Sequence, residues 1–250
     1  NEKNPLGWVK DSVLTDEILK CMDSTQGPDY VYTISVQGHG AYPDEELLED
    51  PQILVTGAPT EEENNKWEYY VNEIHEMDNF IKDLVNKLSD YPEDVVLVMY
   101  GDHLPTMGLT VEEVKNKYLF QTEYVIWDNF GLEKKDENIA AYQMAAEVMD
   151  RVGIHEGTIF RYHQARRNTR NYQVDLETLQ YDLLYGERYA YGGESPFLRT
   201  KMRMGINDVT LDSIQMVSSS DFTYYIKGTE FTPSSQVKLN GEWYDTVYIN

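Results

Sequence analysis

The chain has 250 residues, of which 41% are hydrophobic and 26% charged, a composition typical of a globular protein. Its 21 basic and 44 acidic residues give a formal net charge of −23, which disfavours binding to nucleic acids. The longest strongly apolar run, residues 95–100, is too short to span a bilayer, and the single cysteine, Cys21, excludes an intramolecular disulfide.

The first 160 residues alternate strand-like and helix-like segments, which is typical of an α/β sheet with crossover helices. β-branched and aromatic residues predict strands at 30–36, 95–100 and 123–127. Helices are predicted at 15–22, 61–89, 111–118 and 138–152. The three- and four-residue spacing of apolar side chains is clearest over 61–89, and prolines and glycines predict a long loop before it.

The apolar run at 95–100 is continuous, which suits a strand covered on both faces, as in a parallel sheet with helices on each side. The last third differs. Residues 161–200 are polar and rich in tyrosine without a clean period, and from about residue 208 the pattern is all β, with a hairpin turn at Asn240 and Gly241. We therefore expect an α/β domain over 1–200 and a β-rich segment over 205–250.

A strand predicted to be buried runs directly into Gly101, Asp102 and His103. Ligands of open α/β sheets gather outside the carboxyl ends of strands, so this strand would aim both side chains into such a crevice. A carboxylate oxygen beside an imidazole nitrogen suits Mn²⁺ or Zn²⁺. The plainer alternative is that Asp102 caps the next segment and that His103 is an ordinary loop residue.

The strand predicted at 30–36 ends in a similar way, at Gly38, His39 and Gly40. Two strands that each end in glycine and histidine, joined by one long helix, would converge on one crevice. His39 would then donate a hydrogen bond to a phosphoryl oxygen of a substrate. The alternative is a turn histidine between two glycines.

Three segments, in this order, resemble the sulfatase-fold domain of the lipoteichoic acid synthase family, within the alkaline phosphatase and sulfatase superfamily. They are SVQGHGAYP at 35–43, YVNEIHEMD at 70–78 and VMYGDHLP at 98–105. The resemblance spans roughly residues 5–160 and implies an alkaline-phosphatase-like sheet, present in part. Ala41 stands where that family usually has proline. Leu104 stands where sulfatases have glycine, which favours the phosphotransferase branch.

The resemblance implies that Asp102 and His103 ligate one divalent metal, Mn²⁺ in the first place, with Mg²⁺ or Zn²⁺ as alternatives. It implies that His39 contacts the phosphate or its glycerol. In that family a metal-bound threonine attacks the phosphodiester of phosphatidylglycerol and carries the glycerophosphoryl group to an acceptor. That threonine lies well upstream of the histidine-glycine loop.

Before His39, no threonine stands in a recognisable nucleophile context: Thr15, Thr25 or Thr33. We therefore expect the nucleophile upstream of residue 1, and these 250 residues alone to be inactive. The resemblance further implies an anionic lipid headgroup or a glycerophosphate polymer as partner, at the extracellular face of the bacterial cell membrane. Any membrane anchor would lie outside this chain.

Other readings stay open. A sulfatase or a phosphoethanolamine-type transferase belongs to the same superfamily, and a non-catalytic extracellular binding module is the alternative of another class. His75 and Asp78 on the long helix are interpreted as structural. The β-rich end resembles an immunoglobulin-like module, although it is shorter than a complete sandwich.

One basic cluster stands out, interpreted first as pairing with acidic neighbours and alternatively as a phosphate contact: Arg161, His163, Arg166, Arg167 and Arg170.

Overall fold

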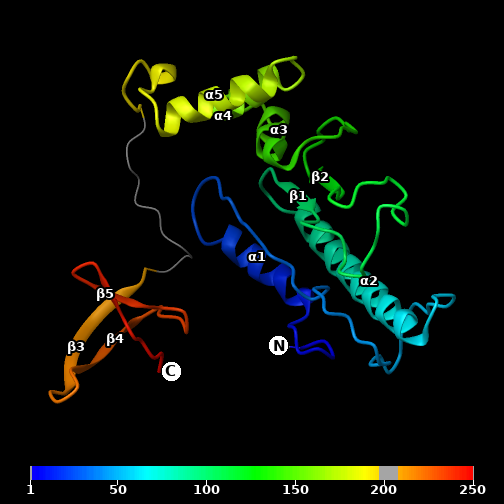
Figure 1. Cartoon of the computed structure of the whole chain (residues 1–250), viewed down its shortest axis with the longest axis horizontal. Coiled ribbons are helices and arrows are strands. Elements are labelled where there is room, and N and C mark those ends of the chain that lie inside the picture. Colours follow the sequence, from blue (N-terminus) through cyan, green and yellow to red (C-terminus); the bar gives the residue numbers. More distant parts are fainter. Residues whose placement is uncertain (1, 197–207, 250) are drawn as a thin grey trace. The chain divides into compact units, whose positions relative to one another are not determined.

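The computed structural model describes residues 2–196 and 208–249 and divides the chain into two compact units, Asn1–Pro196 and Phe197–Asn250 (Figure 1). The α-helices of the first unit are α1 (Leu14–Met22), α2 (Glu61–Ser89), α3 (Met144–Arg151), α4 (Thr158–Arg166) and α5 (Tyr172–Leu184). Its 3₁₀ helices are η1 (Asp11–Val13), η2 (Ala141–Gln143) and η3 (Tyr189–Tyr191), and its strands are β1 (Val96–Tyr100) and β2 (Tyr124–Asp128). Within the described residues, no helix is both long and apolar enough to cross a bilayer.

Helix α2 begins and ends where the sequence predicts, at Glu61 and Ser89. Its start is fixed by Thr60, whose side chain accepts a hydrogen bond from the backbone N–H of Glu63 at 3.2 Å. Three glutamates in the first turn interact favourably with the positive end of the helix dipole. The cap and the apolar period therefore agree, and they make α2 the longest element of the unit.

The apolar core of the first unit lies on α2, where Phe80, Leu84 and Leu88 are buried together. Partly buried side chains from α1, α2 and the strand region pack against them: Leu14, Ile18, Leu19, Met22, Met77, Ile81, Val95, Leu97 and Trp127. The predicted helix at 15–22 is thus confirmed as α1. This packing holds β1 against α2 and so fixes the position from which Gly101, Asp102 and His103 leave the strand (Figure 1).

Strands β1 and β2 form a two-stranded antiparallel sheet that runs from Val96 opposite Asp128 to Tyr100 opposite Tyr124. Both strands were predicted. The expected parallel sheet with helices on both faces is wrong for the described residues, because β2 is the only strand that pairs with β1 in them. The residues of β1 are also at most partly buried. A continuous apolar run indicates faces that can be covered, but it does not fix the direction of the neighbouring strand.

Two further predicted elements are absent from the described part of the chain. Residues 30–36 contain no strand, and residues 111–118 form turns in place of a helix. This region includes Lys117, whose φ of 63° a helix cannot accommodate. The predicted helix at 138–152 is present as η2 followed by α3, so regular α-helix begins later than expected.

Helices α4 and α5 occupy a region for which the sequence pattern predicts no element. Ion pairs connect α3 to the end of α4. The buried Glu147 of α3 forms ion pairs with Lys135 at 3.0 Å, with Arg151 at 3.2 Å, and with Arg167 just after α4. Burial alone would raise the pKa of Glu147, but hydrogen bonds from these three cations hold it at about 2. We call these four residues the ionic cluster.

The second unit consists of strand-only sheets. Strands β3 (Thr210–Ser218) and β4 (Thr223–Thr229) pair antiparallel, as do β5 (Val237–Leu239) and β6 (Glu242–Tyr244). The turn between β5 and β6 is the predicted Asn240-Gly241 pair, and both residues have positive φ, 51° and 89°. Asparagine and glycine tolerate these angles better than other residues, so the hairpin prediction is confirmed.

Candidate functional site

The motif after β1 leaves the strand at Gly101, which is held at its partner strand. The Gly101 backbone N–H donates to the Glu123 carbonyl at 3.3 Å, and the Thr122 hydroxyl donates to the Gly101 carbonyl at 2.6 Å. A Cβ at position 101 would lie 3.5 Å from the Thr122 Cβ, in ordinary contact. The chain therefore turns out of the sheet at a fixed point, and the next two side chains project from there.

Asp102 and His103 lie side by side and face solvent, with 81% and 57% of their side chains exposed. The Asp102 Oδ1 atom accepts a hydrogen bond from the His103 backbone N–H at 2.9 Å and lies 3.7 Å from His103 Nε2. His103 Nδ1 lies 2.8 Å from the Leu104 carbonyl oxygen. If Nδ1 carries the proton, Nε2 presents its lone pair on the same side as the Asp102 carboxylate.

The His39 loop is anchored by Gln37, whose side chain is almost completely buried. The Gln37 Oε1 atom accepts from the Asp11 backbone N–H at 2.8 Å, and Nε2 donates to Glu76 on α2. The Gln37 carbonyl accepts from the Asn4 side chain at 3.2 Å. Residues from the N-terminal segment and from α2 thus fix the backbone two positions before His39.

The His39 ring itself is exposed and lies beside Trp8, with ring centroids 5.8 Å apart and planes at 58°. Its Nδ1 atom contacts the Gly40 carbonyl oxygen. Further along the loop, the Tyr42 ring packs edge-on against Tyr70 of α2 at 5.3 Å, and burial, with a smaller contribution from Tyr70, raises the pKa of Tyr42 to about 12. The loop therefore packs on α2, while the His39 ring stays exposed to solvent.

The two motif loops meet at Gly40 and Thr106. A Cβ added to Gly40 would overlap the Thr106 hydroxyl, so a larger residue at position 40 would force the Thr106 side chain to move. Thr106 follows directly after the Asp102–Pro105 motif. The described residues thus bring the His39 loop against the loop that carries Asp102 and His103, although the strand expected at 30–36 is not formed.

Residues 1–154, more than half of the chain, match the sequence model of the sulfatase family. The chain belongs to the sulfatase family. The superfamily inferred from the three motifs is therefore confirmed, and it is a superfamily of enzymes.

The fold of this sulfatase-family chain resembles that of GacH, a Streptococcus pyogenes phosphoglycerol transferase solved with sn-glycerol-1-phosphate, with a TM-score of 0.65. The match is 22% identical and covers 75% of this chain and 52% of GacH, so the mixed α/β fold is shared. The "Putative cyclic beta-1,2-glucan modification protein" of Rhizobium meliloti (strain 1021) is 23% identical over 225 residues, or 73% of this chain and 35% of that protein. The chain spans about half of the one relative and about a third of the other.

Asp102 and His103 do not complete a metal site within the described residues. No group of three histidine, cysteine, aspartate or glutamate side chains in 2–196 or 208–249 is arranged to hold an ion. Asp102 and His103 offer one oxygen and one nitrogen donor, so further ligands have to come from elsewhere. The assignment of Asp102 and His103 as metal ligands stays a prediction.

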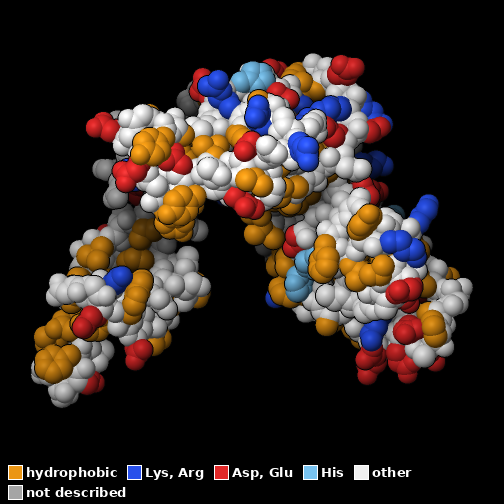
Figure 2. All heavy atoms as spheres, turned by 45° about the horizontal axis from the view of Figure 1, so that its top comes forward, with side chains coloured by type: hydrophobic (Ala, Val, Ile, Leu, Met, Phe, Trp, Pro, Cys, Tyr) orange, Lys and Arg blue, Asp and Glu red, His pale blue; other side chains and the backbone are white. Residues whose placement is uncertain are grey.

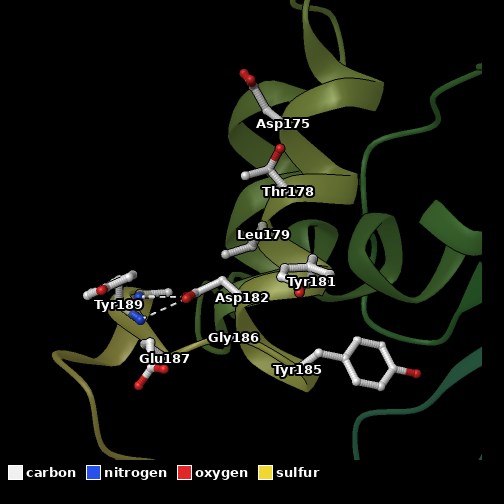
Figure 3. A pocket seen from close by; sticks show the side chains of 10 residues that line it. Asp175, Thr178, Leu179, Tyr181, Asp182, Tyr185, Gly186, Glu187 and Tyr189 are labelled. Carbon is white, nitrogen blue, oxygen red and sulfur yellow. Dashed lines mark hydrogen bonds between the residues drawn. The ribbon is translucent and has the colours of Figure 1, made fainter.

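Two hollows of the described surface lie away from the Asp102–His103 pair. One, of about 310 Å³, lies behind Gln37 and is lined by Lys10, Glu76 and Asn79 among others. The other, of about 730 Å³, lies between the end of α5 and η3 and is lined by Asp175, Leu179 and further side chains (Figure 3). Its lining residues include no lysine or arginine, so this hollow is unsuited to a phosphate group.

In the basic cluster predicted around α4, His163 is buried and Arg167 is partly buried, whereas Arg161, Arg166 and Arg170 are exposed. Arg167 pairs with Glu147 and, at 3.2 Å, with Glu137, while His163 is buried with its Nδ1 atom 2.7 Å from the Tyr172 hydroxyl. Arg166 lies 3.8 Å from Asp175. These contacts favour the interpretation of pairing with acidic neighbours over that of a phosphate contact.

Sequence reasoning missed the residues that orient the site. Trp8 beside His39 and Thr106 beside Gly40 carry no motif of their own. Only Gln37 could have been found from the sequence, because it is a polar residue at the end of a strand-like run, immediately before Gly38 and His39. A buried amide needs hydrogen-bond partners, so such a residue predicts an anchoring contact.

Proposed function

We propose that the chain is the C-terminal part of the extracellular catalytic domain of a phosphotransferase of the lipoteichoic acid synthase type. It would transfer glycerophosphate from a phosphatidylglycerol-like lipid. The observation that carries the proposal is the contact between Gly40 and Thr106, because it joins the His39 loop to the Asp102–His103 loop. A fold shared with a phosphoglycerol transferase that binds sn-glycerol-1-phosphate adds support.

In this proposal His39 binds the phosphate or its glycerol, donating a hydrogen bond to a phosphoryl oxygen. Its exposure, its position beside Trp8 and the fixed backbone at Gln37 suit that role. The chain has a net charge of −23, so an anionic group needs local positive charge to approach. A protonated histidine or a bound cation would supply it.

Asp102 and His103 would hold one divalent ion, Mn²⁺ in preference to Mg²⁺ or Zn²⁺. The donor set fits, because a carboxylate oxygen and an imidazole nitrogen lie 3.7 Å apart and the contact of Nδ1 with Leu104 leaves Nε2 available. When bound, such an ion lowers the pKa of a hydroxyl nucleophile and neutralises charge on phosphoryl oxygens. The nucleophile itself, a threonine, is proposed upstream of residue 1, together with any membrane anchor.

The proposed setting is the outer face of the bacterial cell membrane, with an anionic lipid headgroup or a glycerophosphate polymer as partner. We propose domain limits of 1–200 for the catalytic part and 205–250 for the β-rich segment. The latter would be an immunoglobulin-like spacer without chemistry of its own.

The test is Mn²⁺ binding, followed by electron paramagnetic resonance, to the complete gene product that contains this chain. Asp102→Ala and His103→Ala should each weaken binding by at least about 10-fold. The chain offers a matched control, since His155 and Asp150 are another exposed pair, with Nδ1 and Oδ1 3.3 Å apart. His155→Ala and Asp150→Ala should leave binding unchanged, and equal loss in both pairs would contradict the proposal.

A further inference from the structure

The hollow between α5 and η3 combines tyrosine rings with carboxylates and takes no residue from the motif loops (Figure 3). Three of its lining residues are tyrosines at four-residue intervals, Tyr181, Tyr185 and Tyr189, and their exposed fractions are 66%, 79% and 79%. Large side chains that are exposed singly are ordinary, but three around one hollow form a patch. Such a patch indicates a surface that binds a ligand.

The walls of the hollow are held together by Asp182 on α5. Its two carboxylate oxygens accept hydrogen bonds from the backbone N–H groups of Tyr189 and Ala190, each at 3.0 Å, which ties η3 to α5 (Figure 3). The chain turns between them at Gly186, where a Cβ would lie 2.8 Å from the Asp182 Cα atom. A side chain there would push the turn away from α5, so glycine permits this close approach. The shape of the hollow is thus set by the chain itself.

The rings form an open platform and not a closed cage. Those of Tyr181 and Tyr185 have centroids 6.0 Å apart and planes tilted by 46°. Tyr189 lies on the other side of Asp182 from Tyr185 (Figure 3). A cage for an ammonium group needs several ring faces around one point, each within about 6 Å. The open arrangement therefore favours an extended ligand over a small cation.

The charge of the lining residues disfavours anions. Asp175, Asp182 and Glu187 are acidic, and the lining contains no lysine or arginine. Phosphate groups and anionic lipids would be repelled, as would a second copy of a chain with a net charge of −23. Ionised carboxylates only accept hydrogen bonds, so the ligand has to supply the donors. These conditions describe an uncharged molecule that is rich in hydroxyl groups.

We propose that the hollow between α5 and η3 binds a neutral carbohydrate chain. A sugar ring has C–H groups on its faces and hydroxyl groups at its edge. The faces would pack on Tyr181 and Tyr185, whose rings offer large contact surfaces at low entropic cost. The hydroxyl groups would donate to Asp182 and Glu187, which makes charge-assisted hydrogen bonds. The volume of about 730 Å³ lies within the range of about 300–1,000 Å³ that is usual for ligand sites.

The first experiment is saturation-transfer difference NMR on the complete gene product, with neutral tetrasaccharides of glucose and of N-acetylglucosamine as probes. At least one of them should bind and receive saturation on the C–H protons of its ring faces. Its Kd should be the same at about 0.05 M and 0.5 M salt, because a neutral ligand has no charge to screen. This readout needs neither a nucleophile nor a metal, so it stands apart from the proposed function.

The variants locate the bound sugar. Tyr181→Ala and Tyr185→Ala should each weaken binding by at least about 10-fold, whereas Tyr185→Phe should keep it within about twofold, because the ring face makes the contact. Tyr118→Ala is the matched control, since Tyr118 is as exposed as Tyr181, at 66%, but lies outside the hollow, and it should change nothing.

Three results would overturn the proposal. The first is that neither tetrasaccharide binds. The second is that Tyr118→Ala weakens binding as much as Tyr181→Ala does. The third is that His39→Ala abolishes binding while Tyr181→Ala and Tyr185→Ala keep it, since the sugar would then lie at the motif loops.

Discussion

The first unit is stabilised by two clusters of opposite character. On α2, the apolar core of Phe80, Leu84 and Leu88 holds α1 and the strands. Between α3 and α4, the ionic cluster gathers three cations around the buried carboxylate of Glu147. The apolar core is spread over many side chains that can substitute for one another in part. The ionic cluster depends on a single group, so the two should respond differently to the loss of one side chain.

The largest effect is expected for Glu147→Gln, which keeps the size of the side chain but leaves Lys135, Arg151 and Arg167 without their shared partner. We expect a loss of about 3–5 kcal/mol in the free energy of unfolding, because Arg151 would lose its ion-pair partner and Lys135 and Arg167 would keep only Glu137. Urea denaturation of this variant beside wild type gives the number. A loss below about 1 kcal/mol would show that the cluster is screened like a surface ion pair.

In the apolar core, Leu84→Ala should cost about 2–5 kcal/mol, through lost transfer free energy and the cavity left behind. The same truncation at the exposed Leu54 should stay within about 0.5 kcal/mol. Added salt should change the loss at Leu84 little, whereas it should reduce the stability that the ionic cluster contributes. Equal costs for Leu84→Ala and Leu54→Ala would contradict the core assignment.

The smallest effect is a pH dependence confined to the helices around the ionic cluster. Burial lowers the pKa of His163 from 6.5, so the folded chain keeps this ring neutral where the unfolded chain protonates it. Stability should be fully present above about pH 6.5 and fall below it, by up to about 1.4 kcal/mol per pH unit. Thermal melts of His163→Gln should lack this slope between pH 6.5 and 5, whereas melts of the exposed control His155→Gln should keep it.

The same comparison explains what the sequence could predict. Helix α2 was predicted to the residue, because apolar side chains recur along it at three- and four-residue spacing after a loop rich in proline and glycine. Helices α4 and α5 were missed, because their contacts use polar and aromatic partners, such as the bonds of His163 and Gln143 to the Tyr172 hydroxyl. The periodicity of apolar residues detects helices that bury an apolar face, but it does not detect helices whose buried contacts are hydrogen bonds.

The motif residues of the candidate site could be predicted from the sequence, whereas the residues that hold them in place could not. Asp102, His103 and His39 stand at loops marked by glycine after strand-like runs. The Gly40–Thr106 contact joins residues 66 positions apart, and the bond of Gln37 to Glu76 joins residues 39 positions apart, so no local pattern records either one. The strand at 30–36 failed for a related reason, because composition predicts the preference for a strand but not the presence of a partner.

The central claim is that the His39 loop and the Asp102–His103 loop act on one phosphate group. The most direct test is calorimetric binding of sn-glycerol-1-phosphate to the complete gene product with Mn²⁺ present. We predict that His39→Ala and Asp102→Ala each weaken binding by at least about 10-fold, while the control His75→Ala on α2 leaves it unchanged. Wild-type affinity in both the His39 and the Asp102 variants would contradict the claim.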